Sequence, residues 1–132
     1  MPAKWRIFDY IDSQGRNVML EWAKRLPLQK TERAKLNSKI DLLERVGLDL
    51  APGILADTSN RNIKKLRVRG KRQLRPMLCL GPIILDSEFT FLQGAIEKGN
   101  ELIPPDAAGR ADANRRDLLA NPGKRCDHER FS

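Results

Sequence analysis

The sequence contains few of the residues that build metal sites and disulfide frameworks. Among its 132 residues are two cysteines, Cys79 and Cys126, and a single histidine, His128. Cysteines this far apart match neither a zinc-binding spacing nor the dense pairing of a disulfide framework. One histidine near the end of the chain cannot complete a metal site of His and Cys ligands. We therefore expect no metal and no other cofactor, and a reducing compartment.

Long apolar runs are also missing. The longest, residues 76–85, is interrupted by Gly81-Pro82, and it is about half the roughly 20 residues that a membrane-spanning helix needs. At the start of the chain, Lys4 and Arg6 stand where a signal peptide has its apolar segment. The sequence therefore predicts no membrane association and a cytoplasmic location.

The composition suits one small domain with one core. Hydrophobic residues make up 40% of the chain, which is enough for a single core at this length. Residues 1–120 carry the strand and helix patterns, and we expect them to form one domain. Residues 121–132 begin with the turn signal Asn-Pro-Gly. They predict a disordered tail outside the domain, and this tail includes His128.

Acidic residues are absent from residues 61–75, and this window holds the whole positive excess of the chain. The formal net charge is +8, and outside the window 17 cations face 17 acidic residues. Such a concentration of like charge indicates a polyanionic partner, such as nucleic acid or an acidic protein segment. The eight cations of the window are Arg61, Lys64, Lys65, Arg67, Arg69, Lys71, Arg72 and Arg75.

This basic window has two alternative roles. A charged hairpin can be a solvated surface and nothing more, which is the usual role of a charge run. Binding to an anionic membrane surface is disfavoured, because the window alternates at period two and lacks the wide apolar face of an interfacial helix. The window also has no aromatic residue. We therefore expect it to contact phosphates rather than to stack on bases.

Patterns of period two and of 3.6 residues follow one another along the chain in an α+β order. Predicted strands cover residues 5–11, 63–69, 71–80 and 88–96, predicted helices cover residues 16–26, 28–46 and 104–121, and residues 48–62 are expected to be mostly loop. The predicted fold is a small twisted antiparallel sheet, covered on one face by the N-terminal helical hairpin, with a C-terminal helix. Pro76 has no amide donor and should distort its strand.

Three segments carry a likeness to a known family. They are the basic strand pair at residues 64–75, the strand at residues 89–98, which ends in Lys98, and the helix at residues 111–119. In their order and spacing, these segments resemble the RelE/HigB-type toxins of bacterial toxin–antitoxin pairs, and in particular their phage-derived HigB-like branch. The resemblance extends over residues 5–120, so it implies a RelE-like fold for nearly the whole chain.

The resemblance also implies an activity. Members of that family are small ribonucleases that cleave messenger RNA, commonly in the ribosomal decoding site, and a neighbouring antitoxin protein silences them. It implies an endoribonuclease (mRNA interferase) whose partners are RNA and a cognate antitoxin of the helix-turn-helix type. It further implies paired arginines on the two basic strands. In one register these are Arg67 and Arg72, and in another Arg75 takes the place of Arg72.

The chain departs from the family at the usual acid–base residues. Members often carry a tyrosine or histidine near the end of the last strand or in the closing helix. Here the only tyrosine is Tyr10, and His128 lies beyond the resemblance. A non-catalytic RNA- or ribosome-binding protein on the same fold is therefore the alternative function. A DNA-binding regulator is disfavoured, since no predicted helix carries the basic residues of a recognition helix.

RNA cleavage without a metal uses the 2′-OH as nucleophile against the adjacent phosphate. It needs a proton acceptor, cations for the growing phosphorane charge, and a proton donor for the leaving 5′-oxygen. Arginine suits the charge-stabilising role, because its fork binds two phosphate oxygens. A lysine among like charges loses its proton more easily and can act as base. The candidate catalytic residues are Lys65 as base, the arginines Arg67, Arg75 and Arg72, and Lys98.

The other cations are expected to hold the RNA backbone. Glu97 is an alternative partner for Lys65, although an isolated glutamate is more often solvated surface. Arg67 and Arg75 are expected on the solvent face of the sheet, so replacing either should cost at most about 0.5 kcal/mol of stability. The predicted RNA-backbone contacts are Arg61, Lys64, Arg69 and Lys71 in the basic window, and Arg115 and Arg116 on the last helix.

Overall fold

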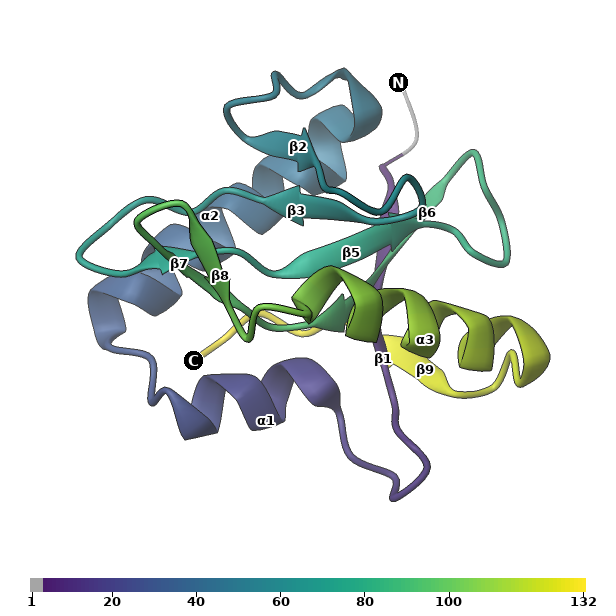
Figure 1. Cartoon of the computed structure of the whole chain (residues 1–132). Helices are drawn as coiled ribbons and strands as arrows, with labels where there is room; N and C mark the ends of the chain where they lie inside the picture. The colour runs from purple at the N-terminus through teal and green to yellow at the C-terminus, as the bar shows by residue number, and fades with distance from the viewer. Residues whose placement is uncertain (1–3) are drawn as a thin grey trace.

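The computed structural model describes residues 4–132, which form an α+β fold (Figure 1). This class was predicted from the sequence and is confirmed. The helices are α1 (Val18–Arg25), α2 (Lys30–Val46) and α3 (Ala107–Ala120), with a short 3-10 helix η1 (Gly47–Asp49) after α2. The strands are β1 (Arg6–Tyr10), β2 (Leu55–Asp57), β3 (Lys64–Leu66), β4 (Gln73–Leu74), β5 (Met77–Leu80), β6 (Glu88–Gln93), β7 (Ile96–Lys98), β8 (Glu101–Ile103) and β9 (Arg125–Asp127). No helix within residues 4–132 has the length and apolarity to cross a membrane.

Six strands form the main sheet, in the order β2-β3-β5-β6-β1-β9. β3, β5 and β6 are antiparallel neighbours, as the sequence predicts. β1 lies parallel to β6, with Ile7 opposite Phe89, so the prediction of a purely antiparallel sheet is wrong at this pair. The pairing joins segments far apart in the chain, and no local pattern reveals it. The edge strand β2 lies within residues 48–62, which were expected to be mostly loop.

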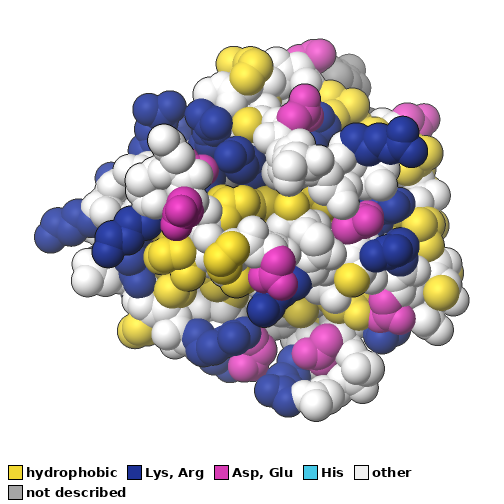
Figure 2. Space-filling view, viewed as in Figure 1, with side chains coloured by type: hydrophobic (Ala, Val, Ile, Leu, Met, Phe, Trp, Pro, Cys, Tyr) yellow, Lys and Arg dark blue, Asp and Glu magenta, His cyan; other side chains and the backbone are white. Residues whose placement is uncertain are grey.

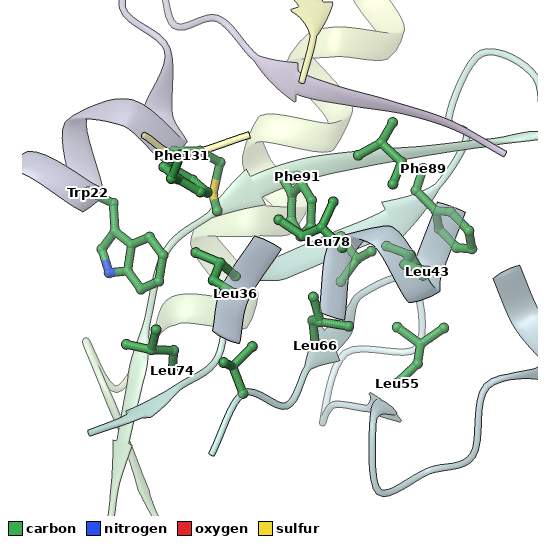
Figure 3. Close-up of a cluster of buried hydrophobic side chains, with 14 of the residues drawn as sticks. Trp22, Leu36, Leu43, Leu55, Leu66, Leu74, Leu78, Phe89, Phe91 and Phe131 are labelled. Atoms are coloured by element: carbon green, nitrogen blue, oxygen red, sulfur yellow. The ribbon is translucent and has the colours of Figure 1, made fainter. Parts of the chain in front are cut away.

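Alternate residues of the central strands face two separate helix layers. On one face, Leu78, Phe89 and Phe91 pack against α1 and α2 in the main core, which Figure 3 shows in close-up. On the other face, Met77 and Cys79 pack against α3. Most of the α3 contacts are made by alanine, whose small side chain lets the helix approach the sheet closely. The buried residues of α3 are Ala107, Ala108, Ala111 and Leu118.

Local signals set the ends of the first two helices. α1 begins at Val18, because the Asn17 side chain accepts hydrogen bonds from two backbone N–H groups of the first turn. At the start of α2, the Glu32 carboxylate accepts a hydrogen bond from the N–H of Gln29. Gly47 ends α2 with a positive φ of 66°, a backbone conformation that favours glycine. Both helices start two residues later than the sequence predicts.

Two predicted strands are broken where the main sheet meets a second, three-stranded sheet of β4, β7 and β8. One splits into β4 and β5 at Pro76, which cannot donate to the ladder. The other splits into β6 and β7 at Gly94 and Ala95, where a Cβ on Gly94 would lie 2.0 Å from the Trp22 ring. At this junction the N–H of Arg75 donates to the Ala95 carbonyl oxygen at 2.8 Å. The junction of the two sheets positions the candidate site.

The C-terminal segment belongs to the fold, which corrects the prediction of a disordered tail at residues 121–132. β9 pairs with β1 at the edge of the main sheet, and Phe131 is buried in the main core. The Asn37 side chain hydrogen-bonds both the N–H and the carbonyl of Phe131. The His128 side chain is buried as well, with Nδ1 2.9 Å from Asp9 Oδ1. The segment has no apolar periodicity of its own. It is ordered by distant partners in β1 and α2, so its order could not be predicted from the local sequence.

Candidate active site

A carboxylate and two cations meet at the junction of the two sheets. The Glu97 carboxylate of β7 lies 3.3 Å from Lys65 Nζ of β3 and 3.7 Å from Arg75 Nε, just before β5. The side chains of Lys65 and Glu97 are 15% and 22% exposed, whereas that of Arg75 is 5% exposed. A ligand can therefore touch Lys65 and Glu97, with Arg75 behind them. These three residues are called the Glu97 cluster below.

The register of the basic hairpin decides which arginines are neighbours. The β3–β5 ladder and the bridge between Val68 and Leu74 share one register, in which Arg67 stands opposite Arg75. Of the two registers that the sequence left open, the structure therefore has the one that pairs Arg67 with Arg75. Arg72 is not opposite Arg67.

Arg75 is buried, which corrects the prediction that it lies on the solvent face. Pro76 interrupts the ladder beside Arg75. The Arg75 side chain is enclosed where β4 and β7 diverge from the main sheet. Its Nη1 donates to the Leu74 carbonyl oxygen at 2.9 Å, and its Nη2 donates to Gln73 Oε1 at 3.5 Å. Among the described residues, Nε has no hydrogen-bond partner. Replacing Arg75 should therefore cost more stability than a surface substitution does.

Burial and nearby charges determine the electrostatics of this arginine. Burial lowers the pKa of Arg75, the charge of Glu97 opposes that shift, and the charges of Arg67 and Arg69 add to it. The Nε of Arg67 is also buried, and no residue in the range 4–132 accepts a hydrogen bond from it. Two adjacent arginines thus keep N–H groups without a protein acceptor, and a phosphate oxygen is a suitable one.

Arg72 holds the hairpin against the helices and is not brought to the Glu97 cluster. Its guanidinium donates to both carboxylate oxygens of Glu32, at 2.8 and 2.6 Å, and to the Leu26 carbonyl oxygen at 2.6 Å. The bond to Glu32 raises the pKa of Arg72 and holds the pKa of Glu32 below its ordinary value. This placement corrects the expectation of Arg72 as the second catalytic arginine and gives it a structural role.

Lys98 ends β7 next to Glu97 but points to the opposite face, because successive residues of a strand alternate. It is exposed and forms no ion pair with any residue between 4 and 132. Glu97, expected to be solvated surface, instead forms ion pairs with two cations. Its place follows from the β4–β7 pairing, in which it stands opposite Gln73. Only this register indicates a role for Glu97. It could not be predicted, because the sequence predicts β4 as part of a longer strand and the start of β7 as part of another.

The predicted RNA-backbone contacts divide into paired and unpaired cations. Lys64 pairs with Asp57 at 2.8 Å. The two α3 arginines pair with Asp112, Arg115 at 2.9 Å and Arg116 at 3.8 Å. Lys and Arg side chains gather over β3 and around the β7–β8 hairpin, at the left of the view in Figure 2. The exposed ones in the basic window that form no ion pair within residues 4–132 are Arg61, Arg69 and Lys71.

Other groups capable of acid–base or thiol chemistry bond to different partners. Tyr10 donates to Asp117 of α3, and burial raises the pKa of Tyr10, with Asp117 adding to the shift. Burial raises the pKa of Cys79 to about 12, as expected of a core thiol. His128 pairs with Asp9. In the described part of the chain, no group of three or more His, Cys, Asp or Glu residues could hold a metal ion.

Comparison of the chain with protein-family models, with curated proteins and with solved structures finds no match in any of the three. The resemblance to RelE/HigB-type toxins therefore stays a prediction from the sequence. What the chain does is inferred from the Glu97 cluster and from the cations around it.

Proposed function

We propose that the protein is a toxin-type endoribonuclease that cleaves messenger RNA by attack of the 2′-OH on the adjacent phosphate. The observation that carries the proposal is the convergence of Lys65, Arg75 and Glu97, with Arg67 opposite Arg75. The cluster and Arg67 supply a carboxylate, an amine and two guanidinium groups in one place. These are the groups that the reaction needs for proton acceptance, proton donation and phosphorane charge.

Glu97 is the proposed proton acceptor. It takes the proton of the 2′-OH as the 2′-oxygen forms its bond to phosphorus. Lys65 is the proposed donor to the 5′-oxygen as the P–O5′ bond breaks, which leaves a 2′,3′-cyclic phosphate and a 5′-hydroxyl. The sequence suggested Lys65 as the base. Its Nζ lies 3.3 Å from the Glu97 carboxylate, beside the proposed proton acceptor, and this position supports the donor role.

Arg67 and Arg75 are proposed to stabilise the charge that develops on the phosphorane. Both have a buried Nε without a hydrogen-bond partner among the described residues. The Arg75 side chain is 5% exposed, so its charge acts from behind the cluster, where the effective dielectric is low and a fixed charge has more effect.

The proposed partners are messenger RNA, held on the ribosome, and a cognate antitoxin of the helix-turn-helix type, in the cytoplasm. They follow from the resemblance to RelE/HigB-type toxins, and the α+β fold is compatible with that likeness. The unpaired cations of the basic window support a polyanionic partner. An antitoxin that silences the protein would cover these cations with an acidic segment or lie along the basic strands.

A non-catalytic RNA- or ribosome-binding protein is the second candidate function. One observation favours it: Glu97 already forms ion pairs with Lys65 and Arg75, and ion-paired clusters of this kind also form for structural reasons. On this alternative the cluster fixes the junction of the two sheets, and only the surface cations contact RNA.

Primer extension on a translated message, with purified variants, separates the two functions. The wild-type protein should cleave and leave 2′,3′-cyclic phosphate ends, and a 2′-deoxy residue at the cleaved position should block the reaction. Glu97→Gln should lower the cleavage rate by about 10²-fold or more. Glu101→Gln is the matched control, because Glu101 lies in the same β7–β8 hairpin and is exposed. A Glu97→Gln protein as active as this control, or a wild type that binds RNA without cleaving it, would favour the second candidate.

A further inference from the structure

A cationic groove follows α2 beside the hairpin between β3 and β4. Two adjoining hollows, of about 530 and 810 Å³, share Lys35, Val68 and Arg69 among their lining residues and so form one groove. Lys35 and Lys39 lie one turn apart on α2, on the same side of the helix. The feature is called the α2 groove below. Its five unpaired cations are Lys35, Lys39, Arg67, Arg69 and Lys71.

These cations have no counter-charge in the described part of the chain. None of the five forms an ion pair within residues 4–132, and the one carboxylate that lines the groove, Glu32, is bound by Arg72. Lys35 Nζ lies 3.5 Å from the position that a Cβ on Gly70 would take, so the α2 cations reach the hairpin. Like charges gathered without compensation repel one another, and such a surface attracts an anionic ligand.

The groove offers charge but no large exposed apolar side chain among the described residues that line it. Val68 and Leu74 in its floor are each 1% exposed, and none of the large apolar side chains exposed within residues 4–132 lines it. No aromatic side chain lines it either. An amphipathic peptide needs pockets for its apolar anchors, and recognition of single-stranded bases needs stacking surfaces. A phosphodiester backbone needs only cations along its path.

Arg67 borders both the groove and the Glu97 cluster. It lines the groove beside Lys39. It also stands opposite Arg75 in the hairpin, close enough for its charge to lower the pKa of Arg75. Val68 and Leu74, which line the groove, alternate along the hairpin with Arg67 and Arg75, so the groove and the cluster lie on opposite faces of the hairpin.

We infer that the α2 groove binds the phosphodiester backbone of single-stranded RNA. The inference rests on the proposed function for its RNA substrate. It extends the contact surface to Lys35 and Lys39 of α2, which lie outside the basic window of the sequence. An acidic protein segment is the competing ligand, and it is disfavoured because none of the large apolar side chains exposed within residues 4–132 lines the groove.

The test is binding of a labelled 2′-O-methyl oligouridylate, which no 2′-OH attack can cleave, measured by fluorescence anisotropy over a range of salt. At about 0.1 M salt, Lys35→Ala/Lys39→Ala should weaken binding about 25-fold, since each phosphate contact to a single strand adds about 0.7 to the salt slope. The slope itself should fall by about 1.4. The matched control is Lys30→Ala/Arg45→Ala, which removes two exposed α2 cations that do not line the groove. Thermal melts check that both variants are folded.

Equal losses of RNA affinity in the groove variant and in this control would overturn the inference, because they would show a general effect of positive charge. A charge-matched oligoglutamate that binds the wild type as tightly as the oligouridylate would also overturn it, in favour of an acidic protein ligand. Charge reversal by Lys35→Glu/Lys39→Glu should deepen the loss of RNA binding. Failure of the proposed function has a different signature: the groove variant loses RNA binding as expected, but the wild type does not cleave a translated message.

Discussion

The Glu97 cluster and the α2 groove are both rich in cations, but their surroundings are opposite. Lys65 and Arg75 share one carboxylate and are largely buried, whereas groove cations such as Lys35 and Arg69 are exposed and have no ion pair within residues 4–132. Paired, buried cations hold a fixed geometry, which suits chemistry on one phosphate. Unpaired, exposed cations suit the binding of many phosphates. Pairing and burial, rather than charge, distinguish the two roles.

The largest effect should come from the cluster. Lys65→Ala removes the proposed proton donor, so the maximal cleavage rate should fall by about 10²-fold to 10³-fold while RNA binding weakens far less. Lys64→Ala is the matched comparison, since the neighbouring residue points to the other face and pairs with Asp57. It should lower affinity and not the maximal rate. A Lys65→Ala protein with the maximal rate of wild type would remove the proposed chemistry from the cluster.

The two arginines that stand opposite one another in the hairpin should differ in how much they contribute to the free energy of unfolding. Arg75→Ala should lower the free energy of unfolding by about 2–3 kcal/mol, because it opens a buried site and leaves Glu97 with one cation. Arg67→Ala, at a half-buried residue, should cost about 1 kcal/mol or less. Urea unfolding of both variants measures the difference. A loss below about 0.5 kcal/mol for Arg75→Ala would contradict its burial.

Arg72→Ala should destabilise the protein by about 1.5 kcal/mol, since it removes hydrogen bonds to the Glu32 carboxylate and to the Leu26 carbonyl. The loss should depend on pH. The pKa of Glu32 is lowered in the folded protein by Arg72, so this contribution is complete above the ordinary value of 4.5 and disappears as the pH falls through the lower folded-state pKa. The gap in unfolding free energy between wild type and Arg72→Ala should therefore narrow in acid. A gap that stays constant as the pH falls would contradict the pairing.

The smallest effect should come from a single exposed cation. Arg61→Ala removes a side chain without an ion pair in the described chain. We expect the salt slope for RNA to fall by about 0.7 and the affinity to fall about fivefold at about 0.1 M salt. Stability should not change measurably. An unchanged slope would place Arg61 outside the RNA-binding surface.

Elements with a strong local pattern were predictable from the sequence. The apolar repeat at Leu36, Ile40 and Leu43 predicts α2, and all three side chains are buried. Period-two alternation predicts β3, β5 and β6. The parallel β1–β6 pair, the ordered C-terminal segment and the break at Gly94 were not predictable, because each depends on a distant partner. The contact between Gly94 and Trp22 is one such case.

The candidate site was predictable to a similar extent. Alternation along the strands brings Arg67 and Arg75 to one face, and the observed register places them opposite one another. The burial of Arg75 was not predictable, since it follows from the divergence of two sheets at this point. The role of Glu97 was not predictable either, because its partners come from other strands. The role of Lys35 was not predictable, because it lies on a helix, outside the run of cations at residues 61–75.

The division of roles between the two regions is tested most directly by one kinetic measurement. Cleavage of a message held on ribosomes is followed over a range of concentrations of that complex for wild type, Glu97→Gln and Lys35→Ala/Lys39→Ala. We expect Glu97→Gln to lower kcat by about 10²-fold with little change in KM. We expect the groove variant to act mainly by raising KM, by about 25-fold at about 0.1 M salt. A groove variant that lowers kcat while KM stays constant, or a Glu97→Gln protein that raises only KM, would contradict this division of roles.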